Sequence, residues 1–167
     1  MNVELVSITQ PVGKIVEEGI KTADDLVAYI ARVSNPSNQF NTLTAPKLIR
    51  YLTKHKHWSP FEMTHMGVEI KTSRAIAAQI LRHRSFSFQE FSQRYSKVNK
   101  FEDIEWRLQG KTNRQVGDEP VELDKQLENS ISLHLDNSFM LYDELLKEGV
   151  AKECARNILP LTTETTM

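Results

Sequence analysis

The sequence lacks several features that mark common protein classes. Its 167 residues include a single cysteine, so no disulfide can form within the chain, which fits a reducing compartment. The six glycines are scattered, and neither a G-x-G-x-x-G motif nor a P-loop is present. No apolar run approaches the ~18 residues of a membrane helix, and the first residues do not resemble a signal peptide. We therefore expect a cytoplasmic protein with no membrane partner.

An excess of charge of either sign is also missing. Lys+Arg 21 and Asp+Glu 22 leave a net charge of -1, which argues against a general binder of nucleic acids or membrane surfaces. His55 and His57 could contact a metal, but no set of Cys, His and Asp has zinc-site spacing. We expect no metal site.

Hydrophobic spacing predicts an α+β fold: a small mixed or antiparallel sheet packed with helices, and a long helix in the C-terminal half. The length suits one domain, which we expect to span residues 1–167. Residues 160–167 are polar and are not expected to close any part of the fold. Strands are predicted at 2–9 and 64–72, with a weaker one at 101–108, and helices at 22–33, from 44, at 73–81, at 120–147 and at 150–158.

Capping residues locate the helix ends. Thr22 and Thr44 are predicted N-caps, and Pro120 is expected in the first turn of the longest helix. Lys147 in the last turn and Gly149 just beyond it are typical of a helix C-terminus, so the longest helix is predicted to end there.

Other polar residues have ordinary structural interpretations. Ser59 and Glu62 fit a capping box. Arg32 and Arg156 each lie near a helix end, where solvation at the surface is the default. Cys154 lies among small and apolar residues of a predicted helix, and we expect a core residue rather than a nucleophile.

Residues 82–96 concentrate positive charge beside aromatic rings. Four basic side chains between 82 and 97 outnumber one acidic residue, Glu90. A local cationic patch with aromatic neighbours suggests an anionic, planar ligand. Gln79, Arg82 and His83 share one face at a helix end. Basic residues there often do no more than cap the helix, so that alternative stays open.

The second half of this stretch suits a nucleotide if the chain is extended. An extended backbone would place Glu90, Ser92, Arg94 and Ser96 on one side, with ~13 Å between the first and third of these. That length is about the span of a nucleotide from base to phosphate. A carboxylate, hydroxyls and an arginine in such a row suit sugar or base at one end and phosphate at the other. A solvated strand face is the equal alternative.

Four short segments together resemble the flavin-dependent thymidylate synthase family. Arg82-His83-Arg84, seven intervening residues and Ser92 match the family signature. The match extends to Gln79 upstream and to Arg94-Tyr95-Ser96 downstream. His57-x-Ser59-Pro60-Phe61-Glu62 resembles the second family motif, and two further segments follow in the expected order, Ala31-Arg32-Val33-Ser34 and Ala155-Arg156 to Leu159-Pro160.

The resemblance implies an enzyme that methylates dUMP to dTMP. It implies methylenetetrahydrofolate as carbon donor, an FAD-borne hydride, NADPH as reductant and a homotetramer with shared active sites. The positions that correspond to FAD contacts are Ser34, Ser59, Glu62, Arg82, His83, Arg84 and Glu90. Those that correspond to dUMP contacts are Gln79, Arg82, Glu90, Ser92, Gln93, Arg94 and Arg156.

One departure from the family pattern concerns the C-terminus. In the family the chain continues past the equivalent of Leu159-Pro160, and an arginine that polarises the uracil lies in a segment beyond the equivalent of Met167. We therefore assign no catalytic residue and expect a C-terminally truncated family member. Two alternative functions stay open: a single-stranded nucleic-acid-binding module, and an inactive fragment that binds FAD or dUMP without turnover.

Overall fold

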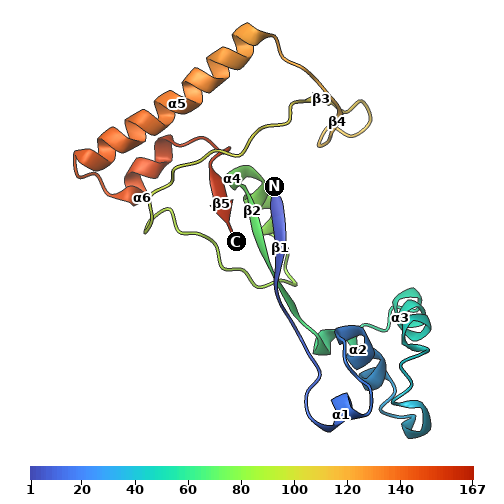
Figure 1. Cartoon of the computed structure of the whole chain (residues 1–167). Coiled ribbons are helices and arrows are strands. Elements are labelled where there is room, and N and C mark those ends of the chain that lie inside the picture. Colours follow the sequence, from blue (N-terminus) through green and yellow to red (C-terminus); the bar gives the residue numbers. More distant parts are fainter. The chain divides into compact units, whose positions relative to one another are not determined.

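The computed structural model describes residues 1–167, which divide into two compact units. We call Glu4–Glu69 the N-terminal unit, and Met1–Val3 with Ile70–Met167 the C-terminal unit. As predicted, the fold is α+β, with helices and small sheets. None of the helices combines the length and apolar composition needed to cross a membrane. The helices are α1 (Lys14–Glu17), α2 (Ala23–Ala31), α3 (Ala45–Lys54), α4 (Arg74–Ile80), α5 (Lys125–Lys147) and α6 (Lys152–Ala155), and the strands are β1 (Asn2–Ile8), β2 (Met66–Ser73), β3 (Arg107–Gln109), β4 (Gly117–Pro120) and β5 (Glu164–Thr166) (Figure 1).

In the N-terminal unit, α2 begins at the predicted cap. Thr22 Oγ1 accepts a hydrogen bond from the backbone N–H of Asp25, and the Asp25 carboxylate accepts one from the backbone N–H of Thr22. This reciprocal capping box satisfies two N–H groups that a helix start leaves unpaired. α2 packs against α3 and buries Val27, Ala28 and Leu52.

Three predictions for this unit fail in whole or in part. Thr44 is the N-cap residue of α3, as predicted, but its hydroxyl accepts no hydrogen bond from the helix start and instead accepts one from Arg32 Nη2 at 2.8 Å. Arg32 is buried, contrary to the expected solvation, because its guanidinium also donates to the Asn41 carbonyl oxygen.

Ser59 and Glu62 form no capping box, since Phe61–Met63 is a single 3-10 turn after Pro60 with no side-chain cap.

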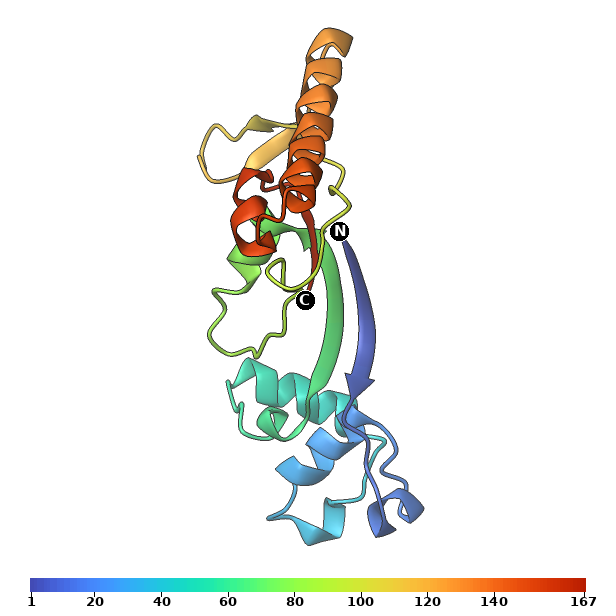
Figure 2. The ribbon, with the colours of Figure 1, turned by 90° about the vertical axis from the view of Figure 1, so that its left-hand side faces the viewer.

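The C-terminal residues complete a sheet, which corrects the expectation for 160–167. β5 pairs antiparallel with β2, with Thr165 opposite Thr72, and the strand order is β1-β2-β5 (Figure 2). Thr163 and Thr165 are buried although both are polar. The predicted strand at 101–108 is reduced to one bridge between Phe101 and Thr163, followed by β3 in a hairpin with β4.

The long helix α5 starts later than predicted and ends as predicted. Pro120 is the last residue of β4, and the helix begins after Asp124, whose carboxylate accepts the N–H groups of Gln126 and Leu127. Gly149, at φ 82°, follows the last turn, a conformation that glycine adopts without strain. α6 follows, and Cys154 within it is exposed rather than in the core.

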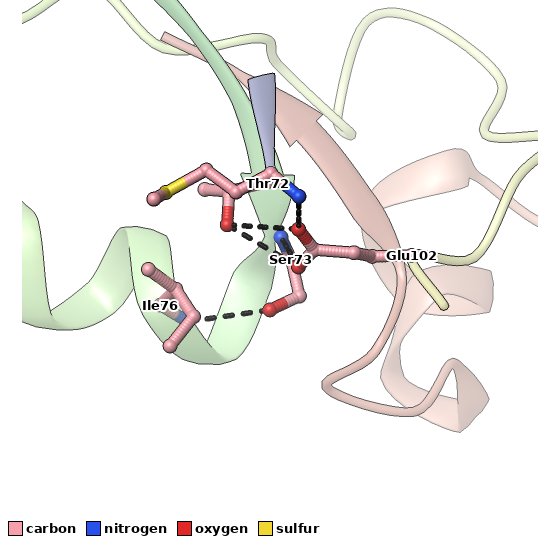
Figure 3. Close-up of polar contacts among 5 residues, drawn as sticks. Thr72, Ser73, Ile76 and Glu102 are labelled. Carbon is pink, nitrogen blue, oxygen red and sulfur yellow. Dashed lines mark hydrogen bonds and ion pairs between the residues drawn. The ribbon is translucent and has the colours of Figure 1, made fainter. Parts of the chain in front are cut away.

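Glu102 joins three segments of the C-terminal unit (Figure 3). Its carboxylate accepts hydrogen bonds from Ser73 N–H at 2.6 Å and Thr72 Oγ1 at 3.2 Å, and it pairs with the Met1 ammonium at 2.6 Å. Ser73 in turn caps α4 by accepting from Ile76 N–H. Burial raises the pKa of Glu102, but the hydrogen bonds from the ammonium and Ser73 outweigh burial and hold this pKa below its ordinary 4.5.

Candidate functional site

A cavity of about 290 Å³ in the C-terminal unit is rich in hydrogen-bond donors. Arg74 is the first residue of α4, Gln93 lies in a turn, and Arg156 begins a 3-10 helix that follows α6. No aspartate or glutamate lines the cavity. Two guanidinium groups without a lining carboxylate favour an anionic occupant. The remaining lining residues are Asn157, Leu159, Pro160, Leu161 and Thr163.

Two of these donors have no partner within the chain. Gln93 is only 6% exposed, and its amide Nε2 makes no hydrogen bond. A buried, unpaired polar atom costs free energy, and proteins rarely keep one without a ligand, a water or a functional reason. Arg156 is half-buried and forms no ion pair, in contrast to Arg94 and Arg107. Both groups are therefore available to a ligand.

Arg74 also forms an ion pair with Glu90. Its Nη1 lies 2.5 Å from Glu90 Oε1, and the Thr165 hydroxyl donates to the same oxygen at 3.1 Å. The backbone N–H of Arg74 is bonded to the Thr163 carbonyl oxygen at 2.9 Å. Neither Arg74 nor Thr165 lies in a sequence motif that predicts the site. The sequence does contain one signal for this ion pair. Arg74 lies in the first turn of a helix, where a cation opposes the helix dipole and an acidic partner compensates it.

Residues 92–96 form a turn, which corrects the prediction of an extended row. The N–H groups of Tyr95 and Ser96 both donate to the Ser92 carbonyl oxygen, at 3.0 and 2.9 Å. Only the N–H of Phe91 pairs with β5, so no strand partner keeps the following residues extended. Arg94 Nε lies 2.9 Å from Glu153 Oε2, and both side chains are more than half exposed.

Arg82, His83 and Arg84 lie just beyond α4, whose C-cap is Leu81. All three are exposed, and neither arginine has an ion-pair partner. The His83 ring stacks on Phe86 with centroids 3.9 Å apart, and His83 Nδ1 accepts from Ser85 N–H. Gln79 lies in the last turn of α4, as expected. Two uncompensated cations in consecutive turns suit a multiply charged anion.

The other predicted site residues, Ser34, Ser59 and Glu62, belong to the N-terminal unit and are exposed. The structure thus brings Gln93 and Arg156 into one cavity, with Glu90 paired to a third lining residue. No group of three or more His, Cys, Asp or Glu side chains is placed to hold a metal ion.

Comparisons with known proteins match nearly the whole chain. The family described as "Thymidylate synthase complementing protein" (Thy1) matches residues 15–167. The chain is 50% identical to a "Probable flavin-dependent thymidylate synthase" of Paramecium bursaria Chlorella virus 1, and covers 77% of it. It is 46% identical to the "Flavin-dependent thymidylate synthase" of Synechocystis sp., and covers 76% of that protein. The alignments cover 100% and 99% of this chain, respectively.

A solved structure shares the fold. The chain matches a UMP/dUMP methylase, PolB from Streptomyces cacaoi bound with 5-Br dUMP, with a TM-score of 0.77 and 31% identity. The match covers 99% of this chain and 69% of that one.

Proposed function

Because this chain belongs to the Thy1 family, that of the flavin-dependent thymidylate synthases, we propose that it methylates dUMP to dTMP. The carbon comes from methylenetetrahydrofolate, the hydride from reduced FAD, and NADPH is the reductant. The enzyme works as a homotetramer with shared active sites. The UMP/dUMP methylase that shares the fold was solved with a brominated dUMP, which supports a pyrimidine nucleotide as substrate.

The observation that carries this proposal is the cavity formed by Arg74, Gln93 and Arg156. Its donors and its lack of lining carboxylates match the phosphate end of a nucleotide. Gln93 and Arg156 are also positions at which the family motif expects dUMP contacts. Glu90 can accept a hydrogen bond from the sugar or base. Gln79, Arg82, Ser92 and Arg94 complete the proposed dUMP contacts.

The FAD contacts are proposed from the exposed cations after α4. Arg82 and Arg84 have no acidic partner, so their charges are free to bind the cofactor pyrophosphate. Ser34, Ser59, Glu62, His83 and Glu90 complete the set. When bound, reduced FAD would supply the hydride that turns the transferred methylene into a methyl group. The role of this chain is to bind and orient the ligands, and an arginine near the flavin would stabilise negative charge on it.

Exposed apolar side chains support self-association. On α5, Leu133, Met140 and Leu141 are 62%, 57% and 54% exposed. Exposed apolar surface of this kind is typical of protein interfaces. Light scattering on the purified protein should therefore give the mass of a tetramer, and a monomer would contradict this part of the proposal.

The test is turnover by the purified protein. We expect visible absorbance from bound flavin, and dTMP formation from dUMP that requires both methylenetetrahydrofolate and NADPH. UMP serves as the matched alternative substrate, and NADH as the alternative reductant. A colourless protein that forms no dTMP would contradict the proposal. Flavin and dUMP binding without turnover would indicate an inactive binding protein. Oligonucleotide binding with a steep salt dependence and no competition by dUMP would indicate a nucleic-acid-binding module.

A further inference from the structure

We propose that Arg74 and Thr165 are positioning residues that orient the carboxylate of Glu90 toward the bound nucleotide. The inference rests on the proposed function, in which Glu90 contacts dUMP. It adds two residues that lie outside the motifs on which the resemblance depends.

The two donors converge on one oxygen of Glu90. Arg74 Nη1 and Thr165 Oγ1 both bond to Oε1, at 2.5 and 3.1 Å, whereas Oε2 has no hydrogen-bond partner. Two bonds to one oxygen, from donors on α4 and β5, restrict the rotation of the carboxylate. The other oxygen stays free to accept a hydrogen bond. Glu90 is thus fixed through Oε1, and its Oε2 is available to a ligand.

Both donors are fixed by the backbone. Arg74 starts α4, where its own N–H donates to the Thr163 carbonyl oxygen and the next N–H donates to Leu161. Thr165 is 2% exposed and lies in β5, opposite Thr72 of β2. Beside Glu90, the N–H of Phe91 donates to the Thr166 carbonyl oxygen at 2.8 Å. A site supported by a helix start and a paired strand is held more rigidly than one on a free loop.

Arg74 also separates two groups of like charge. It lines the cavity assigned to the phosphate and at the same time pairs with Glu90. Without this cation, the Glu90 carboxylate would repel a phosphate bound in the neighbouring cavity. The arrangement lets one ligand place an anion against Arg74 and a hydroxyl or N–H donor against Glu90 Oε2. A nucleoside monophosphate carries both groups.

The test compares threonines one residue apart on β5. Thr165→Val removes the hydroxyl that bonds to Glu90 and keeps the branched shape, whereas the Thr166 side chain forms no hydrogen bond to Glu90, so Thr166→Val is the control. Because the carboxylate contacts dUMP in both ground and transition states, KM for dUMP should rise while kcat changes little. We expect about a tenfold rise in Thr165→Val, as for loss of a hydrogen bond to a charged group, and no change in Thr166→Val.

Arg74 is tested by charge replacement. Arg74→Met should raise KM for dUMP by more than tenfold, and Arg74→Lys should recover part of the loss by restoring the cation. Combining Arg74→Met with Glu90→Gln should cost less than the sum of the two single effects, since the residues act as a unit. Flavin content and melting temperature are measured in each variant to separate positioning from folding.

Several outcomes would overturn the inference. One is a KM for dUMP in Thr165→Val equal to that of Thr166→Val. A second is unfolding of Thr165→Val, which would assign its hydroxyl to the fold instead. Should Arg74→Met not fold, Arg74→Lys takes its place. If KM for dUMP in both Arg74→Lys and Thr165→Val equals that of wild type, the inference is refuted. Wild-type protein that neither binds nor converts dUMP would instead contradict the proposed function.

Discussion

Glu102 allows a stringent test of how the start of α4 is held. We consider Glu102→Gln, which keeps the size of the side chain but removes its charge. The carboxylate accepts Ser73 N–H at 2.6 Å and pairs with the Met1 ammonium at 2.6 Å, and the Glu102 side chain is 18% exposed. In the variant an amide NH₂ must face at least one of these donors.

The expected loss follows from those contacts. A hydrogen bond from Ser73 N–H to a charged acceptor contributes about 1.5–3 kcal/mol. The ammonium is half exposed, so its ion pair contributes no more than about 1 kcal/mol. We expect the free energy of unfolding at pH 7 to fall by about 2–3 kcal/mol. Glu105→Gln is the control, because Glu105 pairs with Arg107 at the exposed surface, and we expect a loss within about 0.5 kcal/mol.

The pH dependence gives an independent check. The pKa of Glu102 is lowered on folding, so its contribution to stability is full above the ordinary value of 4.5 and is lost as the pH falls through the lowered pKa. The difference between wild type and Glu102→Gln should therefore shrink in that window.

Urea unfolding provides the assay, at fixed protein concentration and over a series of pH values. Tryptophan fluorescence in a Trp58→Phe background would report the C-terminal unit through Trp106. Equal stabilities of the Glu102 and Glu105 variants at pH 7, or a difference that does not change with pH, would refute this reasoning.

Three further predictions concern single side chains. Gln93→Leu should weaken dUMP binding about tenfold without lowering the melting temperature, because the amide nitrogen it removes has no partner in the chain; a destabilised variant with unchanged dUMP affinity would contradict this. Arg32→Met should lower the free energy of unfolding by about 2 kcal/mol, and Arg32→Lys should recover little, since the guanidinium bonds to both Thr44 and Asn41; full recovery by lysine in urea melts would show that charge alone suffices. Thr22→Ala should cost about 1 kcal/mol through loss of the capping box, and circular dichroism melts that match wild type would argue against it.

Local signals in the sequence predicted many helix ends correctly. The Thr22 cap and the Gly149 end depend on neighbours a few residues away, and both were confirmed. The prediction that Pro120 opens the longest helix is wrong because a proline can also end a strand, as it does in β4. The helix start is set by Asp124, whose carboxylate caps it four residues later.

Features that depend on distant partners were missed. β5 is polar on both faces, so it has no hydrophobic alternation, and Thr165 is buried where this strand pairs with β2. The β-branched threonines at 162, 163, 165 and 166 were a strand signal of another kind. Arg32 looked like a surface residue because Asn41, whose carbonyl oxygen accepts from its guanidinium, is nine residues away in sequence.

The candidate site was predicted in part. Sequence motifs identified Glu90, Gln93 and Arg156 as candidates, and the cavity contains two of them. Arg74 and Thr165 are 16 and 75 residues from Glu90, so only the fold reveals that they meet on its carboxylate. The extended row at 90–96 was wrong because a backbone turn at Ser92 redirects the chain.

The central claim is that the cavity lined by Arg74, Gln93 and Arg156 binds the phosphate of the substrate. Calorimetric titration of wild type and Arg156→Met with dUMP and with deoxyuridine tests it most directly. We predict that wild type binds dUMP at least about tenfold more tightly than deoxyuridine, and that Arg156→Met loses most of this difference. Equal affinity of wild type for the two ligands, or a preference that Arg156→Met leaves unchanged, would contradict the account.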